Sequence, residues 1–246
     1  MTEPLLSVTN LRKSFGAVLV VDDVSFDVAG GEVLGVMGPN GAGKTTMLNL
    51  VSGALPADAG RIRLAGHDVS RLGVVGRCRR GIGRTHQVPR PFEGMSVFEN
   101  VLVGATHGGG GAAHGRRRDR YRTANAAIER AGLSRKANRL AGSLPLLDRK
   151  RLELARALAT TPQVILLDEI AGGLTEPEVQ TLVALVLELR ESGLGIIWIE
   201  HVVHALMSTV DRLMALTFGH VIAQGDPQTV MSSDELQQAY LGTVAP

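Results

Sequence analysis

Residues 33–46 read VLGVMGPNGAGKTT, an apolar run that leads directly into a glycine-rich loop. The run has the composition of a buried strand, and the segment from Met47 onward has that of a helix. The loop between them fits G-x-x-x-x-G-K-[ST], whose glycines let backbone N–H groups turn toward a phosphate at a helix N-terminus. Lys44 places a charge for the β- and γ-phosphates of a nucleoside triphosphate, and Thr45 offers a hydroxyl to Mg²⁺. The predicted nucleotide-binding residues are Gly38, Pro39, Asn40, Gly41, Ala42, Gly43, Lys44, Thr45 and Thr46.

The composition is that of a globular protein from a reducing compartment. The chain has 246 residues, 44% of them hydrophobic, enough for one large or two small domains. Cys78 is the one cysteine, so no internal disulfide and no cysteine-based metal cluster can form. The net charge of +2 gives no reason to expect nucleic acid as a partner. The first residues lack a secretory signal, and charges interrupt the apolar residues 194–216, so we expect no membrane span.

Strand patterns lie toward both ends of the chain. Residues 164–167 and 195–199 are apolar runs typical of buried strands, and an amphipathic helix is predicted between them at 178–191. Strands that alternate with helices indicate an α/β core with a parallel sheet. In the first part of the chain, alternation predicts half-buried strands at 5–9, 24–28 and 62–64.

The middle of the chain, from about residue 81 to 160, has the pattern of helices joined by loops. Ser96 is a predicted N-cap, with Glu99 in the capping-box position. The glycines at 108–111 begin a stretch that we expect to be flexible, and RRRDRYR follows at 116–122. This basic cluster is more often a solvated helix face than a phosphate contact, so nucleic acid stays an unexpected partner.

Two of the predicted strands end in residues that can do chemistry. Asp168, at the end of the strand 164–167, can hold Mg²⁺ through water, and Glu169 suits a general base that polarises water against the γ-phosphate. His201 follows the other strand and could steady that water. A rival interpretation pairs His201 with His204 as metal ligands on one helical face, although no third ligand is evident nearby.

This order of phosphate loop, acid-ended strand and histidine-ended strand resembles the nucleotide-binding subunit of an ABC transporter, from residue 5 to 242. RTHQ at 84–87, FEGMSVFENV at 92–101 and AYLG at 239–242 are similar to the branched-chain (hydrophobic) amino acid importer branch. The resemblance implies an α/β P-loop NTPase (RecA-like) core with an antiparallel β subdomain and a helical subdomain. The implied single domain spans 1–246, with the core at about 1–85 and 161–246 and the helical subdomain at about 86–160.

The resemblance also implies roles for residues that no motif assigns by itself. Phe15 falls where the family stacks an aromatic ring on adenine, and Thr46 would touch the α-phosphate. Gln87 matches the loop glutamine that contacts Mg²⁺ and water and links the nucleotide to the membrane subunit. The implied catalytic residues are Lys44, Gln87, Glu169 and His201, the implied Mg²⁺ ligands are Thr45, Gln87 and Asp168, and the implied cofactors are ATP and Mg²⁺.

The chain departs from the family at the signature, Leu-Ser-Gly-Gly-Gln, which opens a helix that completes the partner subunit's ATP site. The equivalent here is LPLLD at 144–148. Pro145 lacks the hydroxyl and the N–H, and Leu146 and Leu147 put side chains where glycines let the backbone approach a phosphate. Asp148 adds a charge that at ~6 Å and an effective dielectric of ~20 repels a phosphate charge by roughly 3 kcal/mol. We expect the helix to form and its anion-binding function to be lost.

Two smaller departures point the same way. Ile170 stands where the family usually has proline, and Thr175 where it usually has Asp or Asn in the loop that crosses the dimer interface. The chain therefore keeps the residues of its own site and lacks those that it would donate. We expect a heterodimer with an intact-signature ATPase subunit, in which one complete site uses Glu169.

The implied function is ATP hydrolysis that powers an importer of branched-chain amino acids or related small polar solutes, with the partner ATPase subunit needed for turnover. Further implied partners are membrane-embedded permease subunits and, indirectly, an extracytoplasmic solute-binding protein, which place the chain peripherally on the cytoplasmic face of the inner or plasma membrane. The alternatives are a nucleotide-dependent regulatory module with little hydrolysis, an ABC ATPase that acts on nucleic acid or ribosomes, and a P-loop small-molecule kinase. Glu169 and His201 oppose the first, and the lack of a coiled-coil insertion or a second tandem domain opposes the second.

Overall fold

The apolar runs of the sequence form the middle of a six-stranded sheet with the order β10-β9-β3-β8-β7-β6. Every residue of β3 (Val33–Met37), β7 (Val164–Asp168) and β8 (Gly195–Ile199) is buried, as runs without alternation predict for a covered parallel sheet. The strands from β9 to β6 are parallel, and β10 pairs antiparallel with β9. The outer strands are β6 (Ile82–Arg84), β9 (Arg212–Thr217) and β10 (His220–Gly225). The structure, a computed structural model, describes residues 4–109 and 115–241.

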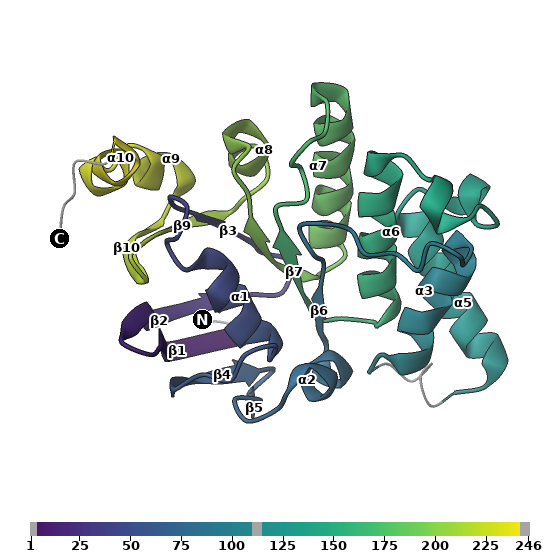
Figure 1. Cartoon of the computed structure of the whole chain (residues 1–246), viewed down its shortest axis with the longest axis horizontal. Helices are drawn as coiled ribbons and strands as arrows, with labels where there is room; N and C mark the ends of the chain where they lie inside the picture. The colour runs from purple at the N-terminus through teal and green to yellow at the C-terminus, as the bar shows by residue number, and fades with distance from the viewer. Residues whose placement is uncertain (1–3, 110–114, 242–246) are drawn as a thin grey trace.

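A second, four-stranded sheet with the order β2-β1-β4-β5 lies beside the first (Figure 1). The three segments predicted from alternation lie in β1, β2 and β4, except that β1 begins one residue later than predicted, at Leu6. Strand β1 pairs antiparallel with both β2 and β4. The long β1–β2 hairpin extends well past the prediction, because its outer part is held by cross-strand pairing rather than by one buried face. The strands are β1 (Leu6–Phe15), β2 (Val18–Val28), β4 (Ala59–Leu64) and β5 (His67–Asp68).

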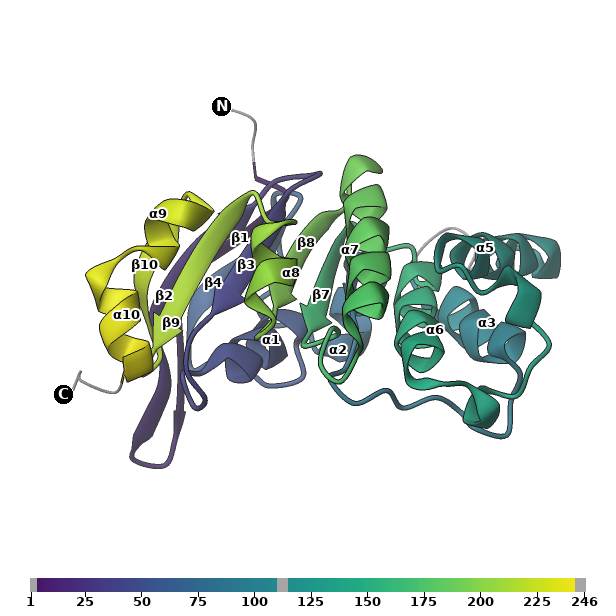
Figure 2. The same cartoon turned by 90° about the horizontal axis from the view of Figure 1, so that it is seen from above.

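Three helices of the middle region pack together at one end of the molecule (Figure 2). They are α3 (Val97–His107), α5 (Arg117–Arg130) and α6 (Leu146–Ala159), with short 3-10 turns at Ser134–Lys136 and Ala141–Ser143. The predicted capping box at Ser96 and Glu99 is confirmed at the start of α3. Residues 110 and 111 of the predicted flexible stretch lie outside the described residues.

The remaining helices surround the six-stranded sheet, with α9 and α10 at the end opposite the three-helix group (Figure 2). They are α1 (Lys44–Ser52), α2 (Val74–Arg80), α7 (Glu176–Glu191), α8 (Val203–Met207), α9 (Pro227–Met231) and α10 (Asp234–Leu241). None of the helices in the described part of the chain has both the length and the apolar character needed to cross a membrane. The predicted α/β class, with its antiparallel sheet and its group of helices, is confirmed.

Candidate nucleotide site

The glycine-rich loop joins β3 to α1 and folds around the Lys44 side chain. Lys44 Nζ donates to the carbonyl oxygens of Gly38 at 2.7 Å and Pro39 at 2.9 Å. Burial lowers the pKa of the Lys44 ammonium, while the carboxylates of Glu169 and Asp168 act in the opposite direction. Gly38 has a φ of 150°, and a Cβ there would lie 2.0 Å from the carbonyl oxygen of Leu216, so this turn of the loop requires glycine.

The N-terminus of α1 is open to an anion. Gly43 at the N-cap gives no side-chain hydrogen bond to the helix, and no acidic residue occupies the first turn. The first N–H groups of the helix and its dipole are therefore left for a phosphate. Thr45 is exposed at this end and Thr46 is half-buried. Phe15, at the end of β1, keeps 48% of its surface exposed, so its ring is available for the predicted stacking.

Asp168 ends β7 with one carboxylate oxygen committed and one without a partner. Its Oδ2 accepts a hydrogen bond from Arg84 at 3.0 Å, whereas Oδ1 is buried and has no hydrogen-bond partner among the described residues. Arg84 also donates to Asn49 Oδ1 at 2.6 Å, which fixes the guanidinium. A buried carboxylate oxygen that lacks a partner is costly, so a ligand that satisfies it is expected. Oxygen donors of this kind suit Mg²⁺.

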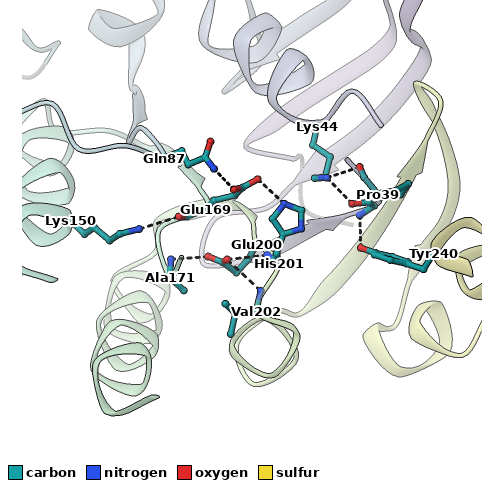
Figure 3. A network of polar contacts seen from close by, with 11 residues as sticks. Pro39, Lys44, Gln87, Lys150, Glu169, Ala171, Glu200, His201, Val202 and Tyr240 are labelled. Carbon is teal, nitrogen blue, oxygen red and sulfur yellow. Dashed lines mark hydrogen bonds and ion pairs between the residues drawn. The ribbon is translucent and has the colours of Figure 1, made fainter. Parts of the chain in front are cut away.

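Glu169 lies between Gln87 and His201, two of the three other predicted catalytic side chains (Figure 3). Its Oε1 is 2.8 Å from Nε2 of His201, and its Oε2 accepts a hydrogen bond from the Gln87 amide at 2.5 Å. The three residues come from the loops that follow β7, β8 and β6, which are neighbours in the parallel sheet. Glu169 has a φ of 48°, in the left-handed region that non-glycine residues rarely adopt. Such strain is often found at functional sites.

Two buried charged residues hold this arrangement, and the sequence did not assign them roles. Glu200 is 3% exposed and accepts hydrogen bonds from the backbone N–H groups of Ala171 at 2.8 Å and His201 at 2.9 Å. Lys150 of α6 donates to the carbonyl oxygen of Glu169 at 3.3 Å, and burial lowers the pKa of its ammonium. The role of Glu200 could have been predicted from its place directly after a buried strand. The role of Lys150 could not, because its contact with Glu169 depends on how α6 packs against the sheet.

The signature equivalent is where the structure corrects the sequence. Pro145 is the N-cap of α6 without a side-chain hydrogen bond, and Leu146 remains 42% exposed. The expectation that Asp148 repels a partner's phosphate is wrong, because its carboxylate is 2% exposed and ion-paired with Lys136. Arg151 Nη1 lies 4.0 Å from its other oxygen. The charge of Asp148 is compensated inside the chain.

The other predicted residues lie elsewhere. His204 Nε2 is 2.9 Å from Glu176 Oε2 on α7, whereas His201 faces Glu169, so the two histidines do not share a ligand position. Within residues 4–109 and 115–241, no group of three or more His, Cys, Asp or Glu side chains could hold a metal ion. Thr175 forms a capping box with Glu178 at the start of α7.

A phosphate loop at an open helix N-terminus, an acid-ended strand and a glutamate beside it define a P-loop ATPase. Residues 21–172 match the family model described as ABC transporter. The chain belongs to this family, whose ATP-binding subunits are ATPases coupled to transport.

Relatives cover nearly the whole chain. The lipopolysaccharide export system ATP-binding protein LptB of Escherichia coli is 36% identical over 237 residues, 96% of this chain and 97% of LptB. The high-affinity branched-chain amino acid transport ATP-binding protein BraF of Pseudomonas aeruginosa is 36% identical over 253 residues, 98% of this chain and 99% of BraF. The ADP conformation of MJ1267, an ATP-binding cassette of an ABC transporter, matches with a TM-score of 0.89 and 31% identity, covering 98% of this chain and 100% of that one. The ABC family and the fold class are thus confirmed, whereas the predicted branch stays a prediction.

Proposed function

We propose that this chain binds MgATP and hydrolyses it to drive a membrane transporter. The observation that carries the proposal is the position of Glu169, whose carboxylate is held between Gln87 and His201 next to the phosphate loop. A carboxylate so placed can take a proton from a water that attacks the γ-phosphate, with His201 steadying the water. Each carboxylate oxygen has a second lone pair, so Glu169 can accept a hydrogen bond from the water while it keeps these contacts.

The other residues of the site are proposed to bind the phosphates and Mg²⁺. Lys44 and the first N–H groups of α1 hold the β- and γ-phosphates. Thr45, Gln87 and Asp168 are the proposed residues that hold Mg²⁺, and the partnerless Asp168 Oδ1 supports this assignment. Bound Mg²⁺ supplies charge neutralisation for the phosphate oxygens.

We also propose that hydrolysis needs a second, different ATPase subunit. Pro145 offers neither a hydroxyl nor an N–H, and the side chains of Leu146 and Leu147 hinder a partner's phosphate from reaching the start of α6. The Asp148 charge is no longer part of this argument. A homodimer then has two incomplete sites, and a heterodimer with an intact-signature subunit has one complete site.

A groove beside Gln87 fits the docking of a permease segment. It encloses ≈ 300 Å³ between α2, α3, α6 and β6, and its lining is largely apolar. His86 lines the groove, and the next residue in the chain, Gln87, donates a hydrogen bond to the Glu169 carboxylate. A segment bound in the groove would therefore contact the residue that precedes Gln87. The groove's lining from both parts of the chain supports the proposed division into a core at about 1–85 and 161–246 and a helical subdomain at about 86–160. The family membership supports the proposed peripheral position on the cytoplasmic face of the membrane. Six of the groove's lining residues are Val74, Cys78, Ile82, His86, Val103 and Ala157.

For the transported solute we propose branched-chain amino acids or related small polar solutes, delivered by a solute-binding protein. The similarity to BraF and the segment at residues 92–101 support it. Export of lipopolysaccharide is the second candidate, favoured by the similarity to LptB. Co-expression with permease pairs of each kind separates them, because only the cognate pair is retained by the purified chain and makes its ATPase respond to the solute.

Steady-state hydrolysis of MgATP tests the proposal, measured for the chain alone and with candidate partner ATPase subunits. Turnover only with an intact-signature partner supports the heterodimer. Robust turnover of the chain alone would contradict the heterodimer and leave the ATPase assignment standing. No turnover with any partner or permease would contradict the ATPase assignment itself.

A further inference from the structure

The last helix of the described chain contacts the phosphate loop. Tyr240, on α10, accepts a hydrogen bond through its hydroxyl from the backbone N–H of Gly38 at 3.1 Å, and the two residues are 202 positions apart in sequence (Figure 3). Gly38 is the first glycine of the phosphate loop. A side chain from the opposite end of the chain therefore takes part in the geometry of the nucleotide site.

The position of Tyr240 is fixed by the packing of α10. Leu236, one turn earlier, is 2% exposed and belongs to the same buried cluster as Leu213 and Ala215 of β9. Strand β9 pairs with β3, the strand that leads into the phosphate loop. The helix also packs against β10 and α9, so it is anchored to the sheet that carries the loop, and Tyr240 reaches Gly38 from this position.

Gly38 is held on both of its backbone groups. Tyr240 accepts from its N–H, and the Lys44 ammonium donates to its carbonyl oxygen at 2.7 Å. A Cβ at this position would meet the carbonyl oxygen of Leu216 at 2.0 Å, so no larger residue fits and backbone contacts must fix the turn. Movement of Gly38 displaces its carbonyl oxygen, which is one of the two carbonyl oxygens that hold the Lys44 ammonium.

We propose that Tyr240 is a positioning residue of the nucleotide site, which holds Lys44 in place for the β- and γ-phosphates by restraining Gly38. The inference rests on the proposed binding of MgATP by this loop and adds the C-terminal helix to the site. The chemistry is that of one neutral hydrogen bond, whose loss weakens phosphate binding by about fivefold.

The test compares Tyr240→Phe with Tyr121→Phe, since the chain has two tyrosines and Tyr121 lies on α5, where its hydroxyl accepts from Arg117. Binding of trinitrophenyl-ATP with Mg²⁺ is measured for each full-length variant, so the result does not depend on hydrolysis. We expect Tyr240→Phe to raise the dissociation constant about fivefold and Tyr121→Phe to leave it unchanged. Equal binding by Tyr240→Phe and the unmodified chain overturns the inference while the proposed function stands.

A double-mutant cycle separates positioning from a general loss of structure. In a Lys44→Ala background, Tyr240→Phe should weaken binding by less than twofold, because its effect passes through Lys44. Thermal melting of each variant is recorded in parallel. A full fivefold loss in the Lys44→Ala background, or a loss that follows the melting temperature in both backgrounds, overturns the inference. If the unmodified chain binds the nucleotide without hydrolysing it, the ATPase proposal fails and this test still applies.

Discussion

The phosphate-loop side of this chain and its signature side each contain a buried aspartate, and the two differ in how completely the carboxylate is paired. Next to the phosphate loop, Asp168 keeps one oxygen without a partner, and the N-terminus of α1 is uncapped by any side chain of the described residues. At the start of α6, Asp148 is paired with Lys136 and lies near Arg151. The first region is open to a ligand, whereas the second is satisfied within the chain. The carboxylate oxygen without a partner therefore marks where a ligand is expected, whereas the compensated charge of Asp148 gives no such indication.

The largest effect should come from Glu169→Gln, which keeps the shape of the side chain and removes the base. We expect ATPase activity of the chain with an intact-signature partner to fall at least about 100-fold, while nucleotide binding persists. Glu191→Gln, at the exposed end of α7, is the matched control. Substantial hydrolysis by Glu169→Gln in that assembly would place the competent site elsewhere.

Restoring the signature residues should remove the difference between the phosphate-loop side and the signature side of the chain. In the triple variant Pro145→Ser, Leu146→Gly and Leu147→Gly, backbone N–H groups can approach a phosphate, and we expect the ATPase of the chain alone to rise about tenfold or more. Leu140→Gly, which adds glycine at another exposed leucine, should have no such effect. An unchanged rate would mean that the signature is not what limits the homodimer.

A smaller effect is expected at Lys150, which links α6 to Glu169. Lys150→Met removes one hydrogen bond to the Glu169 carbonyl, so we expect kcat to fall about fivefold and Lys150→Arg to recover part of it. Burial lowers the folded-state pKa of Lys150, so the unfolded chain holds this proton more tightly. The stability of the unmodified chain relative to the methionine variant should consequently rise as the pH rises toward 10.5. Urea unfolding at several pH values checks the sign.

The smallest effect on nucleotide binding should come from Lys136→Met. Among the described residues it leaves Asp148 with the more distant Arg151 as its ion-pair partner, so the free energy of unfolding should fall by about 1–3 kcal/mol. ATP affinity at the phosphate loop should not change, and Asp148→Asn in the same chain should recover most of the stability. A loss of ATP affinity would show that the two regions are coupled.

The features that could be predicted from the sequence are mainly those determined by residues close together in the chain. The strands at 164–167 and 195–199 and the capping box at Ser96 depend on neighbouring residues, and the structure has them where they were predicted. Gln87, Glu169 and His201 come from distant segments, yet the parallel sheet gathers the ends of their strands at one edge.

The features that the sequence did not predict depend on long-range partners. The carboxylate of Asp148 is neutralised by Lys136, Glu200 bonds to Ala171, and Tyr240 bonds to Gly38. None of these pairings has a spacing rule, because each is set by how separate elements pack. The outer β1–β2 hairpin was missed for the same reason, since cross-strand pairing and not one buried face maintains it.

The backbone of Glu169 sets a limit on how much its side chain must contribute to stability. A glutamate with a φ of 48° costs about 1–2 kcal/mol that glycine would not. The contacts of its carboxylate with Gln87 and His201 offset this cost in the folded chain. Glycine at position 169 would therefore raise the thermal stability if those contacts contribute less than about 1–2 kcal/mol.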